Sequence, residues 1–165
     1  MGDWHDFFVT AAQAAAALAG LIFVGVSINL EMIMANPRYG LADRALEALI
    51  LLVTVLLVTC LLIIPAQGTV VAGLEVLVVG ITDWAAIVVI QLLQVRNWHS
   101  LEATLRPYFL TRVVLGQIAT LPLVAAGIAV LSWGVSGLYL LAAGVLLSFL
   151  VSGANAWILL VEIQR

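Results

Sequence analysis

The chain contains five long apolar runs separated by short polar connections. Each run has about 20 or more mostly apolar residues, the length that a helix needs to cross about 30 Å of hydrocarbon. The runs do not show the alternation of apolar and polar residues that is typical of strands in a membrane barrel. The sequence therefore predicts an all-α fold, a bundle of five transmembrane helices. The predicted spans are 7–30, 44–64, 70–95, 108–131 and 138–161.

The composition favours a membrane protein without a separate soluble domain. Of the 165 residues, 65% are hydrophobic and 9% are charged, whereas soluble domains carry roughly 25% charged residues. We therefore expect residues 1–165 to form a single transmembrane domain whose surroundings are the lipid bilayer. The net charge is −3 and the chain has no lysine, which excludes a basic surface for nucleic acid. Cys60 has no second cysteine with which to form a disulfide.

The arginines predict the orientation of the bundle. With five spans, all six of them fall in or beside connections on one side of the membrane, or at the C-terminus. The positive-inside rule makes this side cytoplasmic, so we expect the N-terminus outside and the C-terminus inside. Trp4, Trp133 and Tyr139 would then mark the outer interface. The arginines are Arg38, Arg44, Arg96, Arg106, Arg112 and Arg165.

One helical face of the first span is polar or small at almost every position. Its residues, alternately four and three apart, are Asp6, Thr10, Gln13, Ala17, Gly20, Val24, Ser27 and Glu31. A second row of small residues, Ala12, Ala16 and Gly20, permits close approach of another helix. Two interpretations are open: a packing seam inside the bundle, or a water-filled path or oligomer axis lined by Thr10, Gln13 and Ser27.

The last two spans also carry polar residues. On the fifth span, Ser148, Ser152 and Asn155 share one face, where such side chains commonly hydrogen-bond to neighbouring helices. We expect them to serve helix packing. On the fourth span, Arg112 lies about one turn inside the membrane boundary. It can anchor the helix by extending to the cytoplasmic interface, or it can pair with an acid at similar depth, Glu47 or Glu162.

The third span holds an acid, Asp83, near its middle. A carboxylate at this depth requires a partner or a function. Glu75 lies near the outer boundary and about 80° around the helix from Asp83, so both can face one broad groove. With Gln91 and Gln94 towards the inner side, the series resembles a proton or cation route. The alternative is a protonated Asp83 that hydrogen-bonds to a backbone carbonyl or to a threonine, Thr54 or Thr120.

The sequence offers no pattern for catalysis or for a cofactor. His5 and His99 are expected on opposite sides of the membrane, so they cannot share a metal site or act together. The zinc-protease, nucleophile-elbow and phosphate-loop motifs do not occur. We therefore expect the protein not to be an enzyme and to use no cofactor and no metal.

Four segments of the chain resemble a family of small bacterial multi-pass membrane proteins. They are 4–9 (WHDFFV), 15–30 (AAALAGLIFVGVSINL), 44–49 (RALEAL) and 65–67 (PAQ). Most members of that family have no assigned activity, and some are labelled modulators of the FtsH protease. The resemblance covers mainly the first 70 residues and implies a location in the bacterial inner membrane.

The function expected from these patterns is a channel-like or transport role for protons, cations or a small solute. The path would use the first and third spans, with Asp83 as the proton or cation site and Glu75 as an outer charge. Thr10, Gln13 and Ser27 would line it, and Glu31 would face the inner mouth. A homo-oligomer is expected. The alternative is a regulator or scaffold, without transport, that binds another membrane protein, for example a membrane protease, through its small-residue faces.

Overall fold

The computed structural model describes residues 4–35, 40–95 and 106–163, and within these residues all regular structure is helical. The predicted all-α class is therefore confirmed. The elements are α1 (His5–Ile28), α2 (Leu30–Ala35), α3 (Leu41–Ile63), α4 (Thr69–Val95), α5 (Arg106–Trp133), the 3₁₀ turn η5 (Gly134–Gly137) and α6 (Leu138–Ile163).

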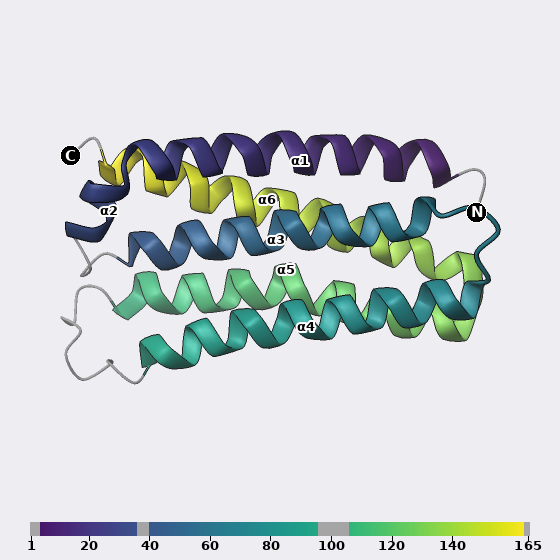
Figure 1. The fold of residues 1–165 in the computed structure, drawn as a ribbon. Helices are drawn as coiled ribbons and strands as arrows, with labels where there is room; N and C mark the ends of the chain where they lie inside the picture. Colours follow the sequence, from purple (N-terminus) through teal and green to yellow (C-terminus); the bar gives the residue numbers. More distant parts are fainter. Residues whose placement is uncertain (1–3, 36–39, 96–105, 164–165) are drawn as a thin grey trace.

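The long helices lie side by side in one bundle (Figure 1). α3 packs against α1 and α6, and α5 packs against α4 and α6. α1 and α4 therefore occupy opposite sides of the bundle (Figure 1). We call one end the Trp4 end, where α1 starts and where η5 and the α3–α4 turn lie. The other is the Gly40 end, where α3 and α5 start and α4 ends.

Four apolar stretches are long enough to cross a membrane by length and composition. They are His5–Ile28, Leu41–Ile63, Thr69–Gln94 and Phe109–Leu159. The last of these covers most of both α5 and α6, which only the short η5 turn separates. The helices agree with the predicted spans to within a few residues, except at the first span, which was expected to continue to residue 30. Instead, α1 ends at Ile28 and Leu30 begins α2, with Asn29 turning between them.

The interior of the bundle is tightly packed in the half nearer the Trp4 end. All five long helices contribute buried apolar side chains to one cluster there, including Phe8, Ala15, Val55, Val58, Leu62, Ala72, Val76, Leu123, Val130, Leu141 and Val145. Glycines bring α4 and α5 especially close. A Cβ atom at Gly127 would lie 2.6 Å from Leu77 Cα, and one at Gly80 would lie 3.1 Å from the Leu123 carbonyl carbon. The two backbones are in contact, as small residues permit in membrane helices.

Candidate functional site

An ion pair is buried between α3 and α5 near the Gly40 end. Arg112 Nε donates to Glu47 Oε2 at 2.8 Å, and the two side chains are 5% and 3% exposed. Glu47 shares the inward face of α3 with Leu51 one turn later, so helix periodicity directs the acid into the bundle. Of the two roles predicted for Arg112, pairing with Glu47 is the one observed. Desolvation offsets much of the attraction in a buried pair, so the pair is a better indication of function than of stability.

Gln94 connects this pair to a second acid. Arg112 Nη1 donates to Gln94 Oε1 at 2.9 Å, and Gln94 Nε2 donates to Asp43 Oδ2. Gly40, directly before α3, lies close to the guanidinium. It has a φ of +59°, and a Cβ atom there would lie 3.4 Å from Arg112 Nη1. Glycine adopts this left-handed conformation without strain. Helices α3, α4 and α5 thus meet in one polar cluster.

Asp83 lies in the middle of α4 and is only 2% exposed. Thr54 Oγ1 on α3 donates to Asp83 Oδ1 at 2.9 Å, which is one of the two threonine contacts predicted. The other predicted partner, Thr120, donates instead to the Gly116 carbonyl of its own helix. Asp83 Oδ2 is buried and has no hydrogen-bond partner among the described residues. One carboxyl oxygen therefore remains able to bind a proton or a cation.

Two glutamines lie between Asp83 and the Arg112 level. Gln117 Nε2 on α5 donates to Gln91 Oε1 at 3.0 Å, and Trp84 Nε1 donates to Gln117 Oε1 at 2.8 Å. Gln91 is buried, and its Nε2 has no hydrogen-bond partner among the residues described. Gly116 makes the room for it, because a Cβ atom at this position would lie 2.5 Å from Gln91 Nε2.

These groups form three hydrogen-bonded clusters in the α3–α4–α5 interior, with the buried apolar side chains of Leu51 and Ile87 between them, and we call the set the polar line. On α4 it extends from Asp83 to Gln94, 11 residues further along, or about 16 Å. Four of its buried side-chain atoms have no partner in the part of the chain that the structure describes: Glu47 Oε1, Asp83 Oδ2, Gln91 Nε2 and Arg112 Nη2. Both donors and acceptors are therefore available along it. The polar line consists of Asp43, Glu47, Thr54, Asp83, Gln91, Gln94, Arg112 and Gln117.

The polar line ends at Asp83 and does not continue to the Trp4 end. Beyond Asp83, apolar side chains of the core cluster fill the space between α3, α4 and α5. Glu75 does not join Asp83 in one groove as predicted. It accepts a hydrogen bond from Gln67 Nε2 in the α3–α4 turn, beside an apolar hollow of about 310 Å³.

The polar residues predicted to line a path on the first span face outward in the single chain. Thr10, Gln13, Ser27 and Glu31 are all exposed on α1 and α2. Ser27 Oγ donates to the carbonyl of Phe23 on its own helix. Since α3 separates α1 from α4, the chain does not bring these residues together with Asp83.

The residues predicted to serve helix packing divide into two groups. Ser148 and Ser152 on α6 are buried: Ser148 Oγ lies 3.4 Å from the Ala119 carbonyl of α5, and Ser152 Oγ donates to the Ala48 carbonyl of α3 at 3.0 Å. Asn155 Oδ1 accepts a hydrogen bond from Arg44 Nη1 at 3.4 Å.

On α1, only Ala12 of the predicted packing row is buried. Ala16 and Gly20 are exposed, and a Cβ atom at Gly20 would have no neighbour within 4 Å. The packing role predicted for these two residues therefore requires a second protein chain. The predicted partner Glu162 and the residue His99 lie outside the described side chains.

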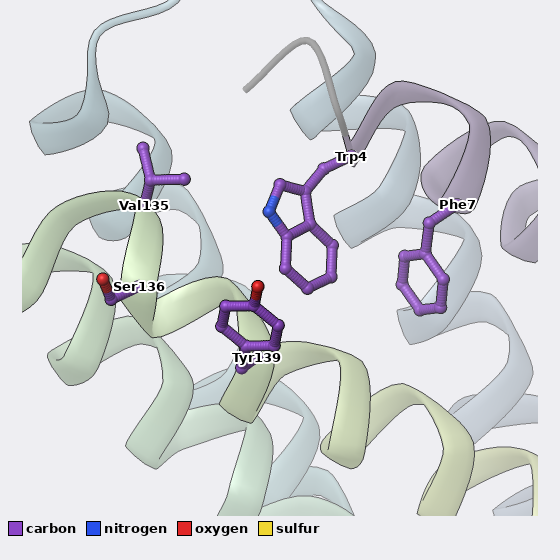
Figure 2. A pocket seen from close by; sticks show the side chains of 5 residues that line it. All are labelled: Trp4, Phe7, Val135, Ser136 and Tyr139. Carbon is purple, nitrogen blue, oxygen red and sulfur yellow. The ribbon is translucent and has the colours of Figure 1, made fainter.

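A groove of about 520 Å³ lies at the Trp4 end, outside the polar line. Figure 2 shows Trp4 and Phe7 of the α1 end facing Val135, Ser136 and Tyr139 of η5 and α6. The Trp4 and Tyr139 rings meet edge to face, with centroids 4.9 Å apart. The described lining residues carry no charge, and their aromatic rings suit the predicted place at a membrane interface.

The sequence patterns missed the cluster at the Gly40 end as a unit. Asp43, Gln94 and Arg112 lie on three different helices, so no spacing within one helix connects them. The available signal was depth: these residues and Glu47 all lie within about two turns of helix ends on the same predicted side. Among the described residues, groups of three or more His, Cys, Asp or Glu side chains suited to a metal ion do not occur.

Comparison with protein-family models, with curated proteins and with solved structures gives no match.

Proposed function

We propose that this chain is a multi-pass membrane protein that moves protons or small cations along the polar line, with Asp83 as the site that binds the moving charge. The observation that carries the proposal is the Asp83 carboxyl group, 2% exposed at the centre of an apolar helix, with Oδ2 unpartnered. Ionisable residues at such depth are rare and typically mark proton or ion routes.

The rest of the polar line supports a route from the Gly40 end to Asp83. Its groups are buried or part-buried between the same three helices and offer both donors and acceptors. The route differs from the one expected from the sequence, because it runs between α3, α4 and α5 and not along α1.

The apolar core beyond Asp83 closes the route towards the Trp4 end. Transfer across the whole membrane therefore requires a second arrangement of the helices, in which Asp83 reaches the other side. Such alternation between two arrangements around a fixed central site is the usual behaviour of transporters.

The test is flux through the purified protein in liposomes. An imposed pH or cation gradient should decay faster with the wild type than with empty liposomes. Asp83→Asn should abolish the excess flux, because an amide cannot take up and release a proton. Asp6→Asn is the matched control, since Asp6 is exposed on α1, across the bundle from α4, and should leave the flux unchanged. The proposal would be removed if, under several ions and voltages, the gradient decayed no faster in liposomes that contain the wild-type protein than in empty liposomes.

The proposal includes a five-span topology in the bacterial inner membrane, with the Trp4 end outside and the Gly40 end in the cytoplasm. The described arginine side chains support this orientation, because Arg44 and Arg112 both lie near the Gly40 end. The outward-facing polar residues of α1 support a homo-oligomer, since Gln13 would otherwise face lipid.

A second candidate function is a regulator or scaffold of another membrane protein, such as a membrane protease. The observation in its favour is the exposed face of α1 that includes Ala16, Ala17 and Gly20. These three residues are too small to keep a second helix away. Small residues of this kind allow helix backbones to approach closely.

A regulator should copurify with one partner in fixed stoichiometry from mild detergent. Gly20→Leu should remove this partner, because the new side chain fills the surface on which the partner helix would pack. Gly153→Leu on α6 is the matched control, since Gly153 is also exposed with no neighbour within 4 Å of an added Cβ atom. Retention of the partner by Gly20→Leu would count against this function.

A further inference from the structure

The Arg112 guanidinium is hydrogen-bonded to oxygen atoms of the polar line near the Gly40 end. Arg112 is 6% exposed and lies level with Gln94, towards the Gly40 end from Asp83. Its Nε binds Glu47 Oε2 and its Nη1 binds Gln94 Oε1. The remaining nearby acid, Asp43, has Oδ2 engaged by the Gln94 amide. Three of the oxygen atoms that a metal cation would need here, Glu47 Oε2, Gln94 Oε1 and Asp43 Oδ2, are therefore already bound to donors.

Glu47 Oε1 is different, because it is buried and has no hydrogen-bond partner within residues 4–35, 40–95 and 106–163. One free oxygen is enough to accept a proton. It is too few for a metal cation, which replaces its water shell by several oxygen ligands at once. The arrangement therefore separates protons from metal cations by the number of ligands that each requires.

We infer that the route is specific for protons. Arg112 acts as a tethered cation, because its guanidinium binds oxygen atoms that a metal cation would need, and Glu47 Oε1 acts as the proton acceptor. The inference rests on the proposed function. In each passage, Glu47 gains a proton at Oε1, becomes a neutral carboxylic acid, and returns to the carboxylate when the proton leaves. Only an O–H bond forms and breaks. The charged groups that act on Glu47 are Arg112 of α5 and the α3 residues Asp43 and Arg44, while the described α4 residues of the polar line at this level are uncharged amides.

The experiment measures ion selectivity with full-length protein in liposomes that contain either a pH-sensitive or a sodium- or potassium-sensitive dye. Wild-type proton flux should be the same in sodium, potassium or N-methylglucamine salt, without uptake of sodium or potassium. Glu47→Gln should lower the proton flux about tenfold or more, since an amide accepts no proton at neutral pH.

Variants of Arg112 test the tethered cation directly. Arg112→Gln frees Glu47 Oε2 and Gln94 Oε1, so sodium or potassium uptake should rise about tenfold or more above the wild type. Arg112→Lys keeps a cation in place and should remain selective. Asp6→Asn is the control, because it also removes a charge but lies exposed on α1 at the Trp4 end, and its selectivity should equal that of the wild type.

The outcomes separate the inference from the function on which it rests. Sodium or potassium uptake by the wild type, blocked by Asp83→Asn, overturns proton specificity and leaves transport in place. Unchanged selectivity in a folded Arg112→Gln protein also overturns it. A wild type that moves no ion removes both. If Arg112→Gln fails to elute as a single folded species, wild-type selectivity and the Glu47→Gln flux decide the question.

Discussion

Two threonines near the middle of the bundle show how the surroundings of a residue determine its contribution to the stability of the fold. Thr54 is buried on α3 and donates across helices to Asp83 Oδ1. Thr82 is exposed on α4 and donates to the Val78 carbonyl of its own helix. Removing the first hydroxyl leaves a buried carboxyl oxygen without a partner, whereas removing the second returns a carbonyl to its ordinary helical hydrogen bond.

We therefore predict that Thr54→Val lowers the free energy of unfolding by about 1–3 kcal/mol, the range for leaving a buried polar group unpaired. Valine has nearly the shape of threonine, so packing is kept. Thr82→Val is the control and should change stability by less than about 0.5 kcal/mol, as is usual for surface positions. Both can be measured by unfolding in mixed micelles of denaturing and mild detergent. Equal losses in the two variants would contradict the importance of the Asp83 contact.

At the scale of the helix, the sequence was sufficient to predict that each long helix exists and approximately where it ends. Apolar length alone determines this, because every backbone polar group must be satisfied within the helix in a membrane. The exception was the end of the first span, where Asn29 Nδ2 donates back to the Gly25 carbonyl and α2 follows. A local side-chain contact of this kind is not visible in an apolar run.

Which face of a helix turns inward could not be predicted equally well. The regular face of α1 that includes Thr10 and Gln13 was predicted to line a path, yet it is exposed. The inward face of α1 is marked by Phe8, Ala11 and Ala15. In a membrane, apolar residues suit both lipid and core, so periodicity does not distinguish the two. On α4, Asp83 was predicted to need a partner or a function, and it is buried against Thr54, because an acid in the middle of an apolar helix is costly to expose to lipid.

At the scale of the whole molecule, the polar line emerges only when three helices are packed together. Asp83, Gln91 and Gln94 were identified from the sequence, whereas their connection to Arg112 and Gln117 depends on how closely α4 and α5 approach at glycines. The distribution of charge is also a property of the whole bundle. Arg44 and Arg112 lie towards one end, whereas Asp6 lies at the other.

The proposed orientation of the bundle rests on this asymmetry and can be tested by labelling. Without Cys60, which Cys60→Ala removes, we predict that a cysteine introduced by Ser136→Cys reacts with a membrane-impermeant maleimide in intact cells. A cysteine introduced by Ala42→Cys should react only after the membrane is opened, because cytoplasmic loops carry the arginines. Both positions are exposed at opposite ends of the bundle. The Cys60→Ala protein alone should remain unlabelled, and the reverse pattern would place the Gly40 end outside, so that the polar line would open away from the cytoplasm.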